Sequence, residues 1–136
     1  MAMTIFNVGV KGIIVKEGRV LLLRGESKGR NFLDAPGGRI DENETIQEAL
    51  VRELHEELPG IKNIEIHELL SAFRVPGMPL GDKGLVLLFH RVTAEFPDGV
   101  RVSEEHDSYE WMPIDEIEAK AARGIADAAK RATTPT

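Results

Sequence analysis

Residues 36–60 constrain the fold of this chain more than any other stretch. They read PGGRIDENETIQEALVRELHEELPG, a glycine turn followed by an acidic loop and then a helix. Thr45 is suited to cap that helix, and Glu48, three positions later, completes a capping box in which each side chain accepts a hydrogen bond from the other residue's backbone N–H. We therefore expect a helix that begins after Thr45 and follows a tight turn at Gly37–Gly38.

The expected helix is amphipathic, with carboxylates at the edge of its apolar face. At about 100° per residue, Glu53, Glu56 and Glu57 fall on the flank that turns toward the core, whereas Arg52 falls on the opposite, solvent side. Like charges at i, i+3 and i+4 repel one another, so these carboxylates must face water or surround a cation. The apolar face itself is formed by Ile46, Leu50, Val51, Leu54 and Leu58.

Two interpretations of the carboxylates are open at this level. Glutamate is a good helix former and is mostly exposed in proteins, which favours a solvated acidic face. The alternative is a site for a divalent cation, because Mg²⁺ takes carboxylate oxygens, keeps several waters and often bridges to substrate phosphates. The pattern over a longer stretch of the sequence distinguishes the two.

That longer pattern resembles the Nudix hydrolase box, Gly-x5-Glu-x7-Arg-Glu-U-x-Glu-Glu-x-Gly-U, where U is a bulky aliphatic residue. Six matches to single-residue positions have a chance probability on the order of 10⁻⁷ per start position, at a background of about one in fifteen each. The one departure puts Pro59 and Gly60 where the box has Gly and an aliphatic residue, and a one-residue insertion would restore both. A helix stop needs Gly or Pro here, so we expect the departure to affect the helix end and not the carboxylates. The matching residues are Gly38, Glu44, Arg52, Glu53, Leu54, Glu56 and Glu57.

The order of apolar and polar segments predicts an α/β layered domain. Residues 4–16 and 19–24 read as a hairpin around a turn at Glu17–Gly18, and a polar loop is expected over 25–31. The resemblance implies more: a Nudix-type α/β/α sandwich with a mixed, partly barrel-like sheet, in a single domain that spans residues 1–136. Further strands are expected at 63–74, 84–96 and 109–112, and helices after Pro113 and over 125–131.

The resemblance also implies a reaction, the hydrolysis of a phosphoanhydride by water that attacks phosphorus. This reaction needs charge neutralisation on the phosphate oxygens and a deprotonated water. The implied cofactor is Mg²⁺, with Mn²⁺ as a substitute. Its expected ligands are Glu53, Glu56, Glu57 and a backbone carbonyl of the turn at Gly37, and Glu53 is also the candidate general base.

Other residues are expected to support these ligands. Arg52 is expected to pair with a neighbouring carboxylate and fix its rotamer. Glu44 is expected to lie behind the ligands, as is Gly38, or to be an additional ligand itself. Glu105, six residues before Trp111, matches the place where some relatives carry a further metal-binding or base carboxylate. Plain solvation in an acidic loop is the alternative for Glu105.

Substrate contacts are expected from the second strand and the loop after it. Arg24 ends that strand beside the proposed cleft, and Lys28 and Arg30 follow. Charge-assisted bonds to phosphate favour arginine, although a surface role is equally open for each of the three. Phe32 and Phe73 are candidates to stack on a base, with core packing as the alternative because aromatic rings bury a large area.

Composition excludes several other classes of protein. The formal net charge of −6 argues against a nucleic-acid surface, and no apolar run approaches the length of a membrane span. The absence of cysteine excludes disulfides and a cysteine nucleophile. The four histidines show no zinc spacing, and only His106 falls near the proposed site. No secretion signal is visible, so a cytoplasmic protein is expected, either monomer or homodimer.

The leading hypothesis is a Mg²⁺-dependent pyrophosphohydrolase that acts on a nucleoside diphosphate derivative. Nucleoside triphosphates, oxidised ones included, are one substrate class, and the short chain without an N-terminal extension fits them. ADP-ribose is the other, because Pro76 lies about sixteen residues beyond the box, as in some ADP-ribose hydrolases. A hypothesis of another class is a catalytically inactive Nudix-fold module that binds nucleotides or regulates. The presence of all the box acids argues against it.

Overall fold

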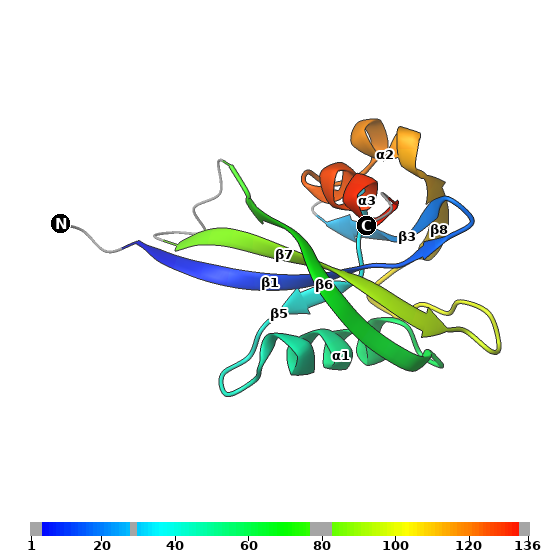
Figure 1. Cartoon of the computed structure of the whole chain (residues 1–136), viewed down its shortest axis with the longest axis horizontal. Coiled ribbons are helices and arrows are strands. Elements are labelled where there is room, and N and C mark those ends of the chain that lie inside the picture. The colour runs from blue at the N-terminus through cyan, green and yellow to red at the C-terminus, as the bar shows by residue number, and fades with distance from the viewer. Residues whose placement is uncertain (1–3, 28–29, 77–82, 134–136) are drawn as a thin grey trace.

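The structure, a computed structural model, describes the backbone of residues 4–27, 30–76 and 83–133 and the side chains of 4–25, 33–76 and 84–133. The described residues form two four-stranded sheets and three helices (Figure 1). The strands are β1 (Ile5–Ile13), β2 (Val15–Lys16), β3 (Arg19–Ser27), β4 (Arg30–Asp34), β5 (Gly37–Arg39), β6 (Lys62–Arg74), β7 (Lys83–Glu95) and β8 (Ser108–Pro113), and the helices are α1 (Ile46–Glu57), α2 (Ile114–Lys120) and α3 (Ile125–Thr133).

The first sheet has the order β5-β1-β7-β6, in which β1 runs parallel to β7 and the other pairs are antiparallel. In the second sheet, β3 pairs antiparallel with β2, β4 and β8. The hairpin predicted from 4–16 and 19–24 is confirmed around its Glu17–Gly18 turn. It is shorter than predicted, because only β2 pairs with β3, whereas β1 belongs to the other sheet. β1 lies between β5 and β7, and its second half, which includes Val10 and Ile13, is largely buried.

Two apolar clusters, one on each side of β1, form the core. Val10 packs with Leu50 and Leu54 of α1, whereas Ile13 packs with residues of α2 and α3 such as Ile117. Figure 1 accordingly shows α1 on one side of β1, β6 and β7, and α2 and α3 on the other. The predicted mixed α/β fold with a sheet between helices is confirmed, although neither sheet closes into a barrel.

Helix α1 begins and ends where the sequence predicts. The Thr45 side chain accepts a hydrogen bond from the Glu48 N–H at 3.1 Å, and the Glu48 side chain accepts one from the Thr45 N–H at 3.0 Å. The last helical residue is Glu57, and Gly60 adopts a φ of 88° in the turn that follows. The departure from the box therefore lies after the helix, where glycine takes a conformation that other residues rarely adopt.

The bounds of β3, β4 and α2 differ in part from those predicted. β3 extends to Ser27 and β4 begins at Arg30, so strands occupy much of the predicted polar loop. Pro113 is the N-cap of α2, one position before the first helical residue. None of the helices in residues 4–27, 30–76 and 83–133 has the length and apolar character needed to cross a membrane.

Candidate active site

The site is built where strand β5 crosses helix α1. The backbone N–H of Gly37 donates a hydrogen bond to Oε1 of Glu57 at 3.0 Å. Gly37 has a φ of 144°, and a Cβ atom placed on it would lie only 2.0 Å from the carbonyl oxygen of Val10. Only glycine fits this position, so the glycine of the turn is what allows β5 to lie against both β1 and the end of α1.

The neighbouring glycine of the same strand receives the second carboxylate. A Cβ atom placed on Gly38 would lie 2.4 Å from Cδ of Glu53. The Glu53 carboxyl group therefore occupies the space that a side chain at residue 38 would need. Together, Gly37 and Gly38 hold two carboxylates of one helix against the backbone of one short strand.

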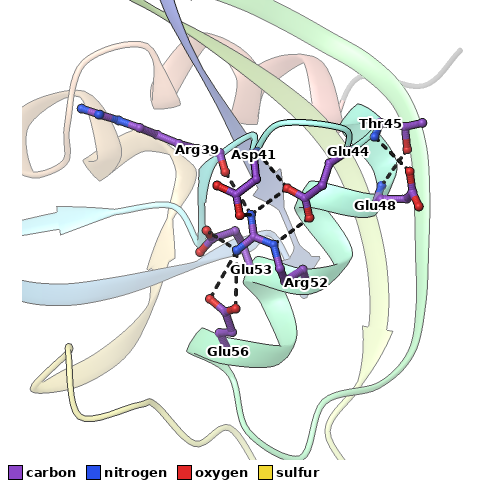
Figure 2. Close-up of polar contacts among 8 residues, drawn as sticks. All are labelled: Arg39, Asp41, Glu44, Thr45, Glu48, Arg52, Glu53 and Glu56. Carbon is purple, nitrogen blue, oxygen red and sulfur yellow. Dashed lines mark hydrogen bonds and ion pairs between the residues drawn. The ribbon is translucent and has the colours of Figure 1, made fainter.

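The guanidinium group of Arg52 contacts three carboxylates, those of Glu44, Glu53 and Glu56 (Figure 2). Its Nε and Nη2 atoms donate to the two oxygens of Glu44 at 2.7 and 2.9 Å. Its Nη1 atom donates to Oε1 of Glu53 at 2.9 Å and lies 3.4 Å from Oε1 of Glu56. The bidentate pair with Glu44 fixes the plane of the guanidinium group, so Arg52 also fixes the direction in which the Glu53 carboxylate points.

The acidic loop before α1 completes this arrangement. Glu44 accepts a further hydrogen bond from the Asp41 N–H at 2.8 Å, and Arg52 donates to the carbonyl of Arg39 at 3.1 Å. The Arg39 side chain itself points away from the cluster (Figure 2). The hydrogen bond from Arg52 lowers the pKa of Glu44, with the Asp41 N–H contributing. Glu44 is therefore ionised at neutral pH and ties the loop to the helix.

The structure confirms that Arg52 pairs with neighbouring carboxylates, but its expected position in solvent is wrong. The Arg52 side chain is 29% exposed, because its long apolar stem lets the guanidinium group reach around the helix to the acidic flank. Glu56 stays at the surface, with 59% of its side chain exposed. Of the three helix carboxylates, only Glu57 is buried.

Burial perturbs the protonation of Glu57. Loss of hydration raises its pKa to about 7, while the Gly37 hydrogen bond and the charge of Lys11 act in the opposite direction. His106 lies beside it, with Nε2 at 3.6 Å from Oε2 of Glu57. Burial lowers the pKa of His106, which favours the neutral ring. The loop that carries His106 is anchored by a hydrogen bond from the Ser103 N–H to the Glu57 carbonyl at 3.0 Å.

A lysine and an aspartate that our sequence analysis did not select also lie near this site. Nζ of Lys11 is 3.1 Å from Oδ2 of Asp34 and 3.3 Å from the carbonyl oxygen of Ala35. Both side chains are close enough to Glu57 to influence its pKa. One signal in the sequence pointed to Lys11, which is the only charged residue in the stretch that forms β1.

The carboxylates do not form a closed ligand set in this structure. Among the described residues, no three acidic or histidine side chains are grouped as a metal ion would require. The carboxylates of Glu53 and Glu56 are both in contact with the Nη1 atom of Arg52, which lies where a cation would have to bind them. Glu57 is turned instead toward Gly37.

The structure describes the side chains of two of the predicted substrate residues, Arg24 and Phe73, and Phe73 lies with α2 and α3, apart from α1. Arg24 forms an ion pair with Glu110, with 3.3 Å between Nη2 and Oε2. The Arg24 carbonyl accepts a hydrogen bond from the N–H of Asp107, the residue after His106. Glu105 is exposed on that loop. Lys28 and the side chains of Arg30 and Phe32 lie outside the described residues.

Phe73 lines a cavity of about 550 Å³ between β6 and the connection from α2 to α3. Gly124, in that connection, has a φ of 91°, and a Cβ atom placed on it would lie 2.7 Å from Cδ1 of Phe73. The Phe73 ring therefore packs directly on the backbone of Gly124. The other residues around the cavity include Ser71, Pro76, Ala122 and Asp127.

Known proteins match this chain in sequence and in fold. The family model described as the NUDIX domain matches residues 3–132. The crystal structure of a MutT Nudix hydrolase from Burkholderia pseudomallei superimposes with a TM-score of 0.76 at 27% identity, covering 93% of this chain and 98% of that one. A MutT protein from Methanosarcina mazei gives a TM-score of 0.76 at 22% identity, covering 96% and 95% of the two chains.

A curated relative has a different name. An octanoyltransferase from Myxococcus xanthus is 28% identical over 123 residues, which are 86% of this chain and 33% of that protein. The chain thus spans about one third of the length of that relative. The activity in its name is a property of the longer protein.

The mixed α/β fold of this chain is that of solved MutT-like proteins, a Nudix hydrolase among them. The chain belongs to the Nudix family, whose model covers nearly all of it. Nudix hydrolases act on small nucleotide derivatives and generally use divalent metal ions.

Proposed function

We propose that this Nudix hydrolase is a Mg²⁺-dependent pyrophosphohydrolase that cleaves a nucleoside triphosphate, oxidised forms included, to the monophosphate and pyrophosphate. The observation that carries the proposal is the placement of two carboxylates from one helix against one strand, Glu53 at Gly38 and Glu57 at Gly37. Both carboxylates thereby lie beside one strand, and carboxylate oxygens are the ligands that a divalent cation such as Mg²⁺ takes.

The residues present fit a divalent metal ion. The proposed ligands are Glu53, Glu56 and Glu57 with the backbone carbonyl of Gly37, all of them the hard oxygen donors that Mg²⁺ prefers, with Mn²⁺ as a substitute. Glu57 is buried with its ionised form disfavoured, so a cation would offset the cost of its charge. When bound, the metal would neutralise charge on the phosphate oxygens and lower the pKa of the attacking water.

The chain's own residues would then position and deprotonate that water. Glu53 is the proposed general base, and Arg52 orients it through the hydrogen bond between Nη1 and Oε1. Glu44 holds Arg52 in turn. Glu105 is proposed as a further base or ligand, because it lies on the loop that folds over Glu57.

The proposed contacts with substrate are basic residues for the phosphates and aromatic rings for the base. Arg24 is a proposed phosphate contact, together with Lys28 and Arg30. The ion pair of Arg24 with Glu110 is about 40% exposed on each side, and such pairs contribute little, so a phosphate could replace the glutamate. Phe73 is proposed to contact the base inside the cavity that it lines, and Phe32 remains a second candidate for stacking.

One structural observation keeps ADP-ribose as a second candidate substrate. Pro76, the residue on which that alternative depends, lines the same cavity as Phe73. The inactive nucleotide-binding module stays as the alternative of another class.

A product assay with Mg²⁺ tests the proposal on a nucleoside triphosphate mixture and on ADP-ribose in parallel. Monophosphate with pyrophosphate is the expected result. AMP with ribose 5-phosphate would shift the assignment to ADP-ribose, and cleavage of neither would favour the binding module. Glu53→Gln should lower turnover by several orders of magnitude with little change in Tm. Glu65→Gln, on the exposed face of β6, is the matched control and should keep full turnover.

A further inference from the structure

We propose that Lys11 is a positioning residue, which holds the turn at Pro36–Gly37 so that the Gly37 N–H faces the Glu57 carboxylate. Its ammonium group acts through Asp34 and Ala35 and, on this proposal, contacts neither the carboxylate ligands nor the substrate. Its consequence for turnover rests on the function proposed above, whereas its consequence for the turn does not.

The backbone of Lys11 lies directly against the turn. In the register of β1 and β5, Lys11 is opposite Gly37. The next residue, Gly12, donates its N–H to the carbonyl of Pro36 at 2.9 Å. The main chain of Lys11 and Gly12 therefore contacts the turn at Pro36 and Gly37.

The side chain of Lys11 contacts the other side of the turn. Its ammonium group reaches Oδ2 of Asp34 at 3.1 Å and the carbonyl of Ala35 at 3.3 Å. The second oxygen of Asp34, Oδ1, accepts a hydrogen bond from the Ala35 N–H at 2.8 Å. The carboxylate thus links the ammonium group to the backbone of the residue that precedes Pro36. Residues on both sides of the turn are therefore held by two adjacent residues of β1, Lys11 and Gly12.

Burial shows that this contact is not an incidental surface pair. Only 14% of the Lys11 side chain and 26% of the Asp34 side chain are exposed, whereas exposed ion pairs contribute little. Burying an ammonium group is costly unless it is paired and hydrogen-bonded. An apolar residue at this position of β1 would avoid the cost, so the lysine needs a reason in its contacts with the turn.

The charges of the pair oppose each other at Glu57. Lys11 lowers the pKa of Glu57, whereas Asp34 raises it. Their combined electrostatic effect is therefore smaller than that of Lys11 alone. The geometry of the turn is the remaining route by which the pair affects Glu57.

The experiment uses Lys11→Met, Asp34→Asn, the double variant and Lys11→Arg in the full chain. Hydrogen exchange of the Gly37 amide, followed by NMR without metal, reports the turn directly. We expect Lys11→Met and Asp34→Asn each to reduce Gly37 protection by about tenfold or more, and the double variant to be no worse than either one. Lys11→Arg should recover part of the protection. Lys62→Met, an exposed lysine at the start of β6, should leave it unchanged.

Turnover gives the second measurement. The single variants should raise the Mg²⁺ concentration needed for half-maximal activity and lower kcat, with non-additive effects in the double variant. Unchanged Gly37 protection in Lys11→Met and Asp34→Asn would overturn the proposal. A rise in KM alone, additive between the two sites, would do so too, because it would mean direct contact with phosphate. If the wild type hydrolyses no phosphoanhydride, the proposed function fails while the amide measurement still decides the role of Lys11.

Discussion

The backbone N–H of Gly37 donates a hydrogen bond to the Glu57 carboxylate at 3.0 Å, joining residues 20 positions apart. This contact fixes one oxygen of a buried acid at the end of α1 and leaves the other, Oε2, 3.6 Å from His106. The acid is held in place by the protein itself, and its unusual pKa is a consequence of that burial.

The pH dependence of stability should report this burial in the metal-free protein. The pKa of Glu57 rises from an ordinary 4.5 to about 7, so between these values the folded state keeps a proton that the unfolded chain has lost. The free energy of unfolding should therefore fall as pH rises from about 4.5 to 7 and then level off. At about 1.4 kcal/mol per pKa unit, the Glu57 contribution is on the order of 3 kcal/mol.

Glu57→Gln removes this titration and keeps an oxygen for the Gly37 N–H. Urea unfolding with a chelator present should show the variant to be more stable than the wild type at pH 8, and closer to it at pH 5. Equal differences at the two pH values would contradict the perturbed pKa. Addition of Mg²⁺ at pH 8 should stabilise the wild type more than the variant.

Gly38→Ala should disable the site while the fold survives. The added methyl group would meet the Glu53 carboxyl group at 2.4 Å and displace it, and a displacement of this kind costs about a hundredfold in turnover. The measurement is kcat with circular dichroism as a check of folding. Gly99→Ala is the matched control: its φ of 81° makes alanine strained, but nothing lies within 4 Å. It should lose stability and keep turnover.

Arg52→Lys should separate orientation from charge. Lysine keeps the positive charge but cannot make the paired contacts to Glu44 and the bond to Glu53 at once. We expect turnover to fall by about ten- to a hundredfold, as for other residues that orient a ligand or base. Arg101→Lys, an exposed exchange on a loop, should have no effect. Full activity in Arg52→Lys would show that the charge alone suffices.

Glu105→Gln tests the loop over α1. Glu104 and Glu105 are neighbours and both are exposed, so Glu104→Gln is a close control for charge and position. We expect Glu105→Gln to lower turnover by at least about tenfold and Glu104→Gln to leave it unchanged. Full turnover in Glu105→Gln would leave that residue with solvation as its only role.

The capping box allows a test of stability away from the chemistry. Thr45→Ala removes the acceptor for the Glu48 N–H and should lower the free energy of unfolding by about 1 kcal/mol. Turnover at a temperature well below Tm should stay near that of the wild type. A large loss of turnover would mean that the first turn of α1 also helps to place the carboxylates further along the helix.

Local interactions explain what was predictable from sequence. The capping box, the end of α1 before Gly60 and the pairing of Arg52 with its neighbours depend on residues that are close in the chain. Helix periodicity places positions i, i+3 and i+4 side by side whatever surrounds the helix. Periodicity therefore placed Glu53, Glu56 and Glu57 on one flank of the helix, and the resemblance to the Nudix box selected them as a candidate site before any tertiary contact was known.

Long-range packing decided the rest. Glu56 and Glu57 are adjacent in sequence, yet Glu57 alone is buried, because β5 covers only one flank of α1 and supplies the Gly37 N–H there. The parallel pairing of β1 with β7, and the contact of Lys11 with Asp34, join segments far apart in the chain. A sequence pattern shows which face of a helix or strand is apolar. Which backbone donor or counter-charge meets that face depends on how the segments pack together.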